Sequence, residues 1–341
     1  MKNLLIISFS IAVISFGSIH NNITGHIIDT AIITGKTATK YANTITTINL
    51  KEHLYTIASS EFEGRETGEP GQKKAAEYLK KFYITNNIVS PYGGSDYFQS
   101  IPTEHLRPNI NPSENVVAFI EGSEKPDEII VISAHYDHLG MNNTEIYYGA
   151  DDDGSGTVAI LEIAKAFQNA AKEGNGPKRS ILFLHVTGEE KGLLGSKYYT
   201  NFPIFPLENT VTNLNIDMIG RVDAAHTNNP NFVYLIGSDK LSTELHNLSE
   251  EINSQFTQLD LDYTYNNDDD PNRFYYRSDH YNFAKNNIPI IFYFNGTHEN
   301  YHKSTDTPDK INYEILAKRT QLVFYTAWEV ANREKRIVVD K

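Results

Sequence analysis

The chain has 341 residues, no cysteine, and a formal net charge of −13 from 43 acidic and 30 basic side chains. Its length allows a full hydrophobic core. The lack of cysteine excludes disulfides and thiolate metal ligands. A metal site must therefore use His, Asp and Glu, which suit zinc or manganese. The acidic balance argues against nucleic acid and anionic membrane surfaces as partners.

The first 17 residues, MKNLLIISFSIAVISFG, have the pattern of a secretory signal peptide. A basic residue precedes an apolar run, and the run ends in a small-x-small cleavage pattern, Ser15-Phe16-Gly17. The run is short for a transmembrane helix, although an uncleaved anchor stays open. We therefore expect a secreted or periplasmic protein without a stable membrane partner after cleavage. Residues 18–45 are expected to form a linker or pro-like segment.

Residues 49–83 show helical periodicity, which the loop SSEFEGRETGEPGQ interrupts. In this loop Arg65 is flanked by Glu63 and Glu66. Gly and Pro punctuate the loop, so the pattern favours a turn between two helices with solvated charges over a functional loop. Edge strands are expected next, before residue 125.

Five apolar runs predict buried strands, and three amphipathic segments predict helices. The strands are expected at Ile129–Ile132, Arg179–Val186, Val211–Ile216, Phe232–Ile236 and Ile288–Phe294, and the helices at Thr157–Lys172, Leu241–Phe256 and Ile311–Arg333. Residues 257–277 lack periodicity and are expected to form a long surface loop, with Asp268–Asp270 as a solvated turn.

The segment 132–156, ISAHYDHLGMNNTEIYYGADDDGSG, gathers His, Asp and Gly around a strand end. His135 and Asp137 share one face because side chains alternate along a strand. A neutral imidazole is the commonest zinc ligand, and its second ring N–H usually reaches a carboxylate. His135 is therefore predicted to bind metal and Asp137 to orient it. By itself, the acidic GADDDGSG stretch could equally be a solvated helix cap.

Acids also follow the next two strands along the chain: Glu189 and Glu190 after one, and Asp217 after the other. One glutamate can bind a metal while its neighbour accepts a proton from metal-bound water, although a lone Glu pair is usually a solvated helix start. Acids at three successive strand ends are hard to explain as caps, since a buried unpaired acid is costly. A shared cation would offset that cost.

Most of the 12 histidines must have other roles. His185 lies inside a strand and is predicted to be a core residue, and three more could be pocket or supporting residues: His138, His280 and His298. His302, next to Tyr301, is the remaining candidate ligand. A site for two zinc ions needs about one His and one acid on each ion plus a bridging carboxylate, a set supplied by His135, Asp152, Glu190, Asp217 and His302.

Five segments, SAHYDHLG, GADDDGSG, GEEKGLLGS, NIDMIG and YHKSTDT, occur in an order and at spacings that resemble the secreted double-zinc aminopeptidases. Their superfamily also contains glutamate carboxypeptidase and glutaminyl cyclase. The likeness runs from about Leu54 to the terminal helix. It implies one zinc peptidase domain over residues 46–341, without an inserted protease-associated domain. The expected fold is a three-layer α/β/α sandwich around a mixed, mainly parallel sheet, with the metal site at the carboxyl ends of its strands.

The resemblance also implies a role for each motif residue, with a peptide as the substrate. His135 and Asp217 would hold one zinc, Glu190 and His302 the other, and Asp152, the fourth residue of Gly-Ala-Asp-Asp, would bridge both. The peptide bond from Asp152 to Asp153 is expected to be cis. Glu189 matches the general base and Tyr301 the residue that stabilises the oxyanion. The expected supporting acids are Asp137, Asp153 and Asp306.

Three alternatives stay open. A glutaminyl cyclase would use a similar Asp, Glu and His set, and a non-catalytic binding domain would keep the fold, although such relatives usually lose ligands. A carboxypeptidase or dipeptidase would need basic groups for a substrate carboxylate. Aromatic residues between 263 and 301 instead suggest a pocket for an apolar amino-terminal side chain: Tyr263, Tyr265, Phe274, Tyr275, Tyr276 and Tyr301.

Overall fold

The computed structural model describes residues 35–341. The predicted signal peptide and most of the predicted linker lie outside the described residues. One compact unit runs from Tyr41 to Lys341 and contains all the elements discussed below. Within residues 35–341, no helix combines the length and the apolar character needed to cross a membrane.

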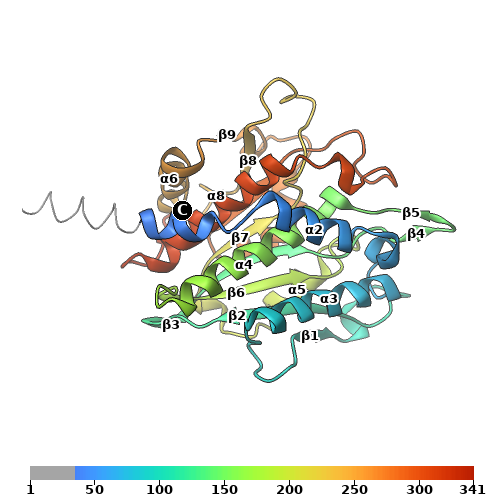
Figure 1. The fold of residues 1–341 in the computed structure, drawn as a ribbon, viewed down its shortest axis with the longest axis horizontal. Helices are drawn as coiled ribbons and strands as arrows, with labels where there is room; N and C mark the ends of the chain where they lie inside the picture. The colour runs from blue at the N-terminus through green and yellow to red at the C-terminus, as the bar shows by residue number, and fades with distance from the viewer. Residues whose placement is uncertain (1–34) are drawn as a thin grey trace, which may run out of the picture. The chain divides into compact units, whose positions relative to one another are not determined.

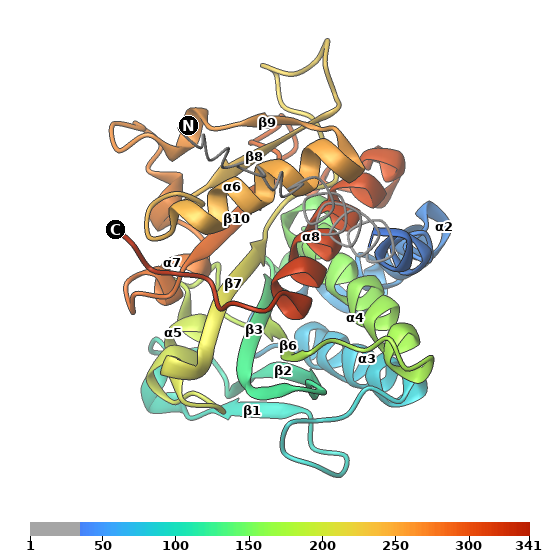
Figure 2. The same cartoon turned by 90° about the vertical axis from the view of Figure 1, so that its left-hand side faces the viewer.

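Eight strands form one sheet, in the order β1-β2-β6-β3-β7-β10-β8-β9 (Figures 1 and 2). Their bounds are β1 (Phe98–Ile101), β2 (Ser113–Ile120), β3 (Lys125–His135), β6 (Arg179–Val186), β7 (Thr210–Ile216), β8 (Phe232–Ile236), β9 (Asp260–Asp262) and β10 (Ile290–Phe294). Strands β6, β3, β7 and β10 run parallel to one another, whereas β1, β2 and β8 pair antiparallel with at least one neighbour. A separate two-stranded ribbon joins β4 (Met141–Asn142) and β5 (Glu145–Ile146).

Helices cover both faces of the sheet (Figure 2). They are α2 (Thr47–Ile57), α3 (Pro70–Asn86), α4 (Gly156–Lys172), α5 (Leu194–Asn201), α6 (Thr243–Ile252), α7 (His280–Ala284) and α8 (Tyr313–Asn332). Helices α3, α4 and α8 pack on one face, with α2 and α6 against them, and α7 packs on the other face beside α5. The predicted three-layer fold is confirmed.

The central strands form where the sequence has β-branched, apolar runs, because both of their faces are covered by helices. Every residue of β6 and β7 is buried. Since β6, β3, β7 and β10 are parallel neighbours, their carboxyl ends meet at one edge of the sheet, where ligands bind in open α/β folds. The residues that follow these four strands carry the candidate site.

Two predictions for residues 257–277 are wrong in detail. Residues 257–277 are not a single loop, because β9 lies within them and pairs in parallel with β8. Within the predicted solvated turn, Asp268 and Asp269 are exposed, but Asp270 is buried and accepts hydrogen bonds from the backbone N–H groups of Asn272 and Phe274. Its carboxylate thus shapes the turn instead of facing water.

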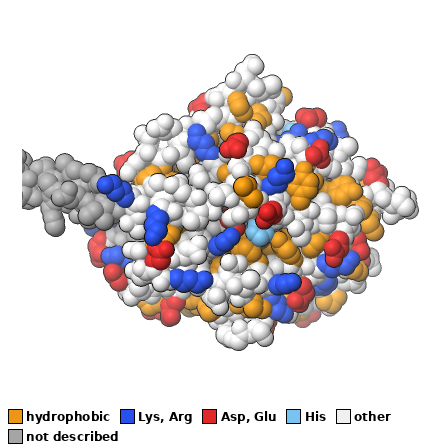
Figure 3. Space-filling model, viewed as in Figure 1, with side chains coloured by type: hydrophobic (Ala, Val, Ile, Leu, Met, Phe, Trp, Pro, Cys, Tyr) orange, Lys and Arg blue, Asp and Glu red, His pale blue; other side chains and the backbone are white. Residues whose placement is uncertain are grey.

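Acidic and basic side chains are interspersed on the face of the molecule drawn in Figure 3. On this face they do not gather by sign, so the excess of acid shown by the composition does not form a single charged patch there.

Candidate metal centre

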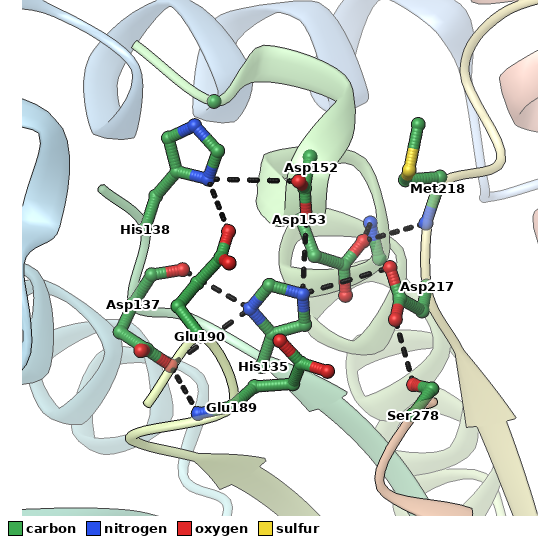
Figure 4. A network of polar contacts seen from close by, with 12 residues as sticks. His135, Asp137, His138, Asp152, Asp153, Glu189, Glu190, Asp217, Met218 and Ser278 are labelled. Atoms are coloured by element: carbon green, nitrogen blue, oxygen red, sulfur yellow. Dashed lines mark hydrogen bonds and ion pairs between the residues drawn. The ribbon is translucent and has the colours of Figure 1, made fainter. Parts of the chain in front are cut away.

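The chain brings His135, Asp217 and Asp152 together at the carboxyl edge of the sheet (Figure 4). His135 is the last residue of β3, and Asp217 follows β7. The His135 Nε2 lies 3.2 Å from Asp152 Oδ1 and 3.5 Å from Asp217 Oδ1. His135 and Asp152 are almost fully buried.

The other ring nitrogen of His135 faces Asp137. Its Nδ1 lies 3.1 Å from the Asp137 carbonyl oxygen and 3.8 Å from the nearer carboxylate oxygen, so the backbone carbonyl is the better hydrogen-bond acceptor. The Asp137 carboxylate instead accepts hydrogen bonds from Thr67 Oγ1 at 2.7 Å and from the Glu189 backbone N–H at 3.2 Å. Asp137 therefore links the His135 strand to the segment that carries Glu189.

Glu190 and His302 approach Asp152 from its other side. His302 Nε2 lies 3.1 Å from Asp152 Oδ2 and 3.4 Å from Glu190 Oε2. His138 also belongs to this cluster, since its Nδ1 is 3.0 Å from Glu190 Oε1 and 3.8 Å from Asp152 Oδ2. The sequence analysis predicted His138 only as one of three possible pocket or supporting residues. Its position three residues after His135 was the signal that could have placed it at the site.

Asp152, not Asp153, has the geometry of a bridge. Its two carboxylate oxygens face His135 on one side and His302 on the other. Asp153 Oδ1 already accepts hydrogen bonds from the Gly156 and Met218 backbone N–H groups, at 2.8 and 3.0 Å. The Asp152–Asp153 peptide bond is cis, as the resemblance implied.

Asp306 supports the same turn. Its Oδ2 accepts hydrogen bonds from the backbone N–H groups of Asp151 at 2.9 Å and Asp152 at 3.2 Å. The neighbouring Asp151 carboxylate contacts His298 Nε2 at 3.2 Å and accepts the Gly220 N–H at 2.7 Å. These contacts hold the Asp-rich segment in a buried position where a solvated helix cap would not lie.

Several polar atoms of the cluster fit a bound cation. The buried side-chain atoms without a hydrogen-bond partner among the described residues include His135 Nε2, His138 Nδ1, Asp152 Oδ2 and Glu190 Oε1. Two groups bring one ligand atom from each member within 4.8 Å of the others: His135, Asp153 and Asp217, and His138, Asp152 and Glu190. Burying so many acids without a counter-charge is costly. A set of imidazoles and carboxylates is also the ligand chemistry that zinc accepts.

The protonation of the site depends on burial. Burial raises the pKa of Glu189 well above its ordinary value; His135 opposes the shift, while Asp217 and Glu190 add to it. For Asp152, burial raises the pKa, but the nearby imidazoles of His135 and His302 outweigh it and hold the pKa well below its usual range. A cation beside Glu189 would favour its ionised form, which a general base needs.

A small pocket opens beside the cluster, with a volume of about 30 Å³. Its lining residues are Asp152, Glu189, Asp217, Met218, Phe274, Arg277, Phe292, Phe294, Tyr301 and His302. Of the six predicted aromatic residues, Phe274 and Tyr301 line it. Phe292 and Phe294 were not predicted as pocket residues, because a buried strand gives no sign of which face meets a cavity.

Two other histidines lie outside the cluster. His185, in the interior of β6, is fully buried and pairs with the hydroxyl of Tyr83 at 2.6 Å, as expected of a core histidine. His280 stacks on Phe292, behind the pocket, and its Nε2 contacts the Tyr275 carbonyl oxygen at 2.8 Å.

Comparison with known families and proteins gives a consistent result. The model of "Peptidase family M28" matches residues 115–327. A vacuolar membrane protease of Verticillium alfalfae is 42% identical over 85 residues, which are 25% of this chain and 8% of that protein. A probable zinc metalloprotease of Leptosphaeria maculans is 36% identical over 113 residues, 31% of this chain and 24% of that protein. The matches thus span less than a third of these relatives' length.

Solved structures share the fold over most of the chain. The LapA aminopeptidase of Legionella pneumophila superposes with a TM-score of 0.68 at 21% identity, over 88% of this chain and 76% of that one. A glutaminyl cyclase of Porphyromonas gingivalis gives a TM-score of 0.63 at 18% identity, over 83% of this chain and 98% of that one. With the family match over most of its compact unit and a cluster that fits the metal, this chain belongs to peptidase family M28.

Proposed function

We propose that this chain is an exported aminopeptidase that hydrolyses the amino-terminal peptide bond of peptides at a site for two zinc ions. The observation that carries the proposal is the position of Asp152, whose two oxygens face His135 and His302 at 3.2 and 3.1 Å. In this proposal His135 and Asp217 hold one ion, and Glu190 and His302 hold the other. His138, which the geometry brings within reach of Glu190, competes with His302 for this role.

When bound, zinc supplies a Lewis acid that makes a water more acidic and polarises the scissile carbonyl. Glu189 lines the pocket and is placed to take the proton of the attacking water and return it to the leaving amine. Its backbone is fixed by the hydrogen bond from its N–H to Asp137. The Tyr301 hydroxyl, also at the pocket, is placed to donate a hydrogen bond to the developing oxyanion.

The pocket supports an apolar residue at the cleaved end of the substrate. Met218, Phe274, Phe292 and Phe294 supply apolar walls, and Asp152, Glu189 and Asp217 line the same pocket, where their charge can hold a free α-amine. The volume of about 30 Å³ holds only two or three waters, at roughly 10–15 Å³ each, so the apolar walls and not the size of the pocket indicate the preference. Apolar side chains are therefore expected to be preferred over charged ones.

A panel of amino-acid para-nitroanilides tests the proposal. The zinc-loaded protein is compared with a chelated sample and with Glu189→Gln. We expect hydrolysis of Leu or Phe substrates that is lost after chelation and in the variant, while the variant still binds zinc. A preference for Arg or Asp amides would contradict the apolar pocket. Activity that survives chelation would contradict the metal mechanism, and pyroglutamate formation from a Gln-peptide would identify a cyclase.

One observation favours a second candidate, a carboxypeptidase or dipeptidase. Arg277 lines the pocket and its Nη2 lies 3.5 Å from the Tyr301 hydroxyl, so a guanidinium is available for a substrate carboxylate. Paired peptides with a free or an amidated carboxyl end separate the two functions. An aminopeptidase cleaves both forms and fails when the amino end is acetylated, whereas a carboxypeptidase shows the reverse pattern.

Export is part of the proposal and has its own test. Mass spectrometry of protein recovered outside the cytoplasm of expressing cells is expected to show a mature chain that starts after Gly17 or further along. Recovery of only full-length, cytoplasmic protein would contradict export.

A further inference from the structure

Arg65 is the residue whose position departs most from the sequence expectation. It ends the 3₁₀ turn η1 (Ser60–Arg65) between α2 and α3, and the prediction that its charge is solvated is wrong, because its exposed fraction is 0%. Its φ is +52°, which is uncommon for a residue other than glycine and shows that its surroundings hold it in place. Turn η1 packs against the β4–β5 ribbon, at the right of Figure 1.

The close approach of this turn depends on Gly64. A Cβ at Gly64 would lie 2.3 Å from the Gly140 carbonyl oxygen and 2.5 Å from that of Tyr147, so only glycine fits. The Gly140 N–H donates to the Gly64 carbonyl oxygen at 3.0 Å. The turn is thereby fixed against the two segments that carry the candidate ligands.

The guanidinium of Arg65 donates hydrogen bonds only to backbone carbonyl groups. Nε donates to Tyr136 at 2.8 Å, and Nη2 donates to Gly149 at 2.8 Å. Nη1 donates to both Ile57, at 3.0 Å, and Tyr148, at 2.8 Å. The planar fork of one arginine therefore joins the end of α2, the segment after β3 and the segment before the Asp-rich turn.

Two of these segments hold candidate metal ligands. Tyr136 lies between His135 and Asp137, and the Arg65 carbonyl oxygen accepts the His138 N–H at 3.1 Å, so Arg65 binds the chain on both sides of Asp137. Tyr148 and Gly149 immediately precede Ala150, the first residue of the turn that contains Asp152.

The buried charge also acts on the acids of the site. Burial lowers the pKa of Arg65 to about 10, and the nearby carboxylates of Asp137, Asp152, Asp153 and Asp306 oppose that shift, which leaves the guanidinium charged at neutral pH. The guanidinium is held in place by its hydrogen bonds to backbone carbonyl groups. It forms no ion pair among the described residues. It lowers the cost of burying several carboxylates in one place.

We propose that Arg65 is a positioning residue for the metal centre, which sets the spacing between His135 and Asp152 by bonding the backbone of both segments. The inference rests on the zinc site of the proposed function. Since Arg65 acts through backbone groups and does not reach the reacting atoms, we expect it to control zinc affinity and kcat while KM changes little.

Arg179 provides a matched control. It is equally buried and also donates to backbone carbonyl groups, those of Val330 at 3.0 Å, Arg333 at 2.5 Å and Glu334 at 3.2 Å, and its Nε in addition pairs with the Glu128 carboxylate. It is the first residue of β6, at the end of that strand away from Glu189. Loss of Arg179 should therefore lower stability without reaching the metal centre.

The experiment compares full-length Arg65→Met and Arg65→Lys with Arg179→Met and Arg179→Lys. Zinc affinity is measured by competition with a chromophoric chelator, beside the melting temperature of each variant. We expect both Arg65 variants to bind zinc roughly 10–100-fold more weakly, as when partners of metal ligands are removed. Lysine keeps the charge but not the fork, so it should restore only part of the affinity. The Arg179 variants should melt at a lower temperature and bind zinc like the wild type.

Each outcome decides the proposal. Wild-type zinc affinity in folded Arg65 variants, or an equal loss in the Arg179 variants, would overturn it. Failure of both Arg65 variants to fold at saturating zinc would also overturn it, in favour of a purely structural role. If the wild-type protein itself binds no zinc, the metal site of the proposed function fails instead, and the two failures are thereby distinguished.

Discussion

The two halves of the proposed metal centre differ in how the fold holds them. The inner half, His135 and Asp217, comes from the ends of adjacent parallel strands, and only 1% and 10% of their side-chain surfaces are exposed. The outer half, Glu190 and His302, comes from loops, with 6% of the Glu190 side chain and 38% of the His302 side chain exposed. His302 also has a φ of +56°. The inner half is thus part of the core, whereas the outer half depends on loop packing.

Contacts around each half extend the contrast. Asp217 Oδ2 accepts the Ser278 hydroxyl at 2.6 Å, and the His135 carbonyl oxygen accepts that of Thr157 at 2.8 Å. In the outer half, the His302 ring stacks on Tyr301, with 3.8 Å between centroids, and the loop is tied to the Asp-rich turn through Asp306, which accepts the Asp152 N–H at 3.2 Å. We expect the inner ion to bind tightly and the outer ion to exchange more readily, because a preorganised site loses less entropy on binding.

The largest effect is expected from Asp152→Asn, which breaks both halves at once. The amide cannot bridge two cations, so activity should fall roughly 10³-fold, which corresponds to several kcal/mol of transition-state stabilisation. Zinc content and kcat/KM for a Leu amide are measured together. Asp151→Asn is the matched control, because Asp151 contacts His298 and Gly220 but neither predicted ligand histidine. Retained zinc and activity in Asp152→Asn would exclude a bridging role.

The comparison between the halves is tested most directly by His135→Ala and His302→Ala. In His302→Ala we expect the outer ion to be lost on dialysis and the inner ion to remain. In His135→Ala we expect loss of the inner ion and a lower melting temperature, since buried acids are left without a partner. Zinc content is measured by atomic absorption after dialysis.

His138→Ala completes this set, because His138 and His302 both approach Glu190. If His302 is the ligand, His138→Ala keeps two ions. If His138→Ala loses the outer ion and His302→Ala keeps two ions, His138 and not His302 is the ligand of the outer ion.

The difference between the halves also explains what the sequence could predict. The strand Arg179–Val186 was predicted with its correct bounds, and the helix over residues 157–172 to within one residue. Long apolar runs and amphipathic periodicity are local signals, and the sheet then brings the strand ends together. The proximity of His135 and Asp217 could therefore be predicted from the sequence, because each residue lies at the end of an apolar run that forms a strand.

Other features depend on partners far along the chain and leave no local signal. Asp151 and Asp152 could not be told apart by residue type, and the choice of Asp152 relied on the family resemblance. Arg65 looked like a solvated turn residue because three of its four acceptors lie 71 to 84 positions later. The same holds for Phe292 and Phe294, whose strand was predicted but not the side that meets the pocket.

A third prediction concerns protons in the outer half. Burial lowers the pKa of His302, but the Asp152 and Glu190 carboxylates, to which the protonated ring donates, outweigh it and raise that pKa to about 10 in the metal-free protein. Zinc binds the neutral imidazole, so binding must release this proton. Below pH 10 the affinity for the outer ion should rise about tenfold per pH unit, until the site is deprotonated.

Calorimetry in buffers with different ionisation enthalpies measures the released protons. About one proton should accompany the outer ion, by the same one-proton linkage, and His302→Ala should abolish its release. Zinc binding with the same affinity at all pH values from neutral to alkaline would show that His302 is already neutral in the metal-free protein.

The smallest effect is expected in the pocket beside the outer half. Phe274 is buried and forms one apolar wall, so Phe274→Ala should enlarge the cavity and favour larger amino-terminal side chains. We expect the ratio of kcat/KM for Phe over Ala para-nitroanilides to rise roughly tenfold, since a change in pocket volume of this kind is worth about 1–3 kcal/mol. Zinc content should stay unchanged. Tyr276→Ala, at an exposed residue outside the lining, is the control and should keep the wild-type ratio. A ratio that changes equally in both variants would place the side-chain subsite elsewhere, whereas a change in Phe274→Ala alone would locate substrate selection in this pocket.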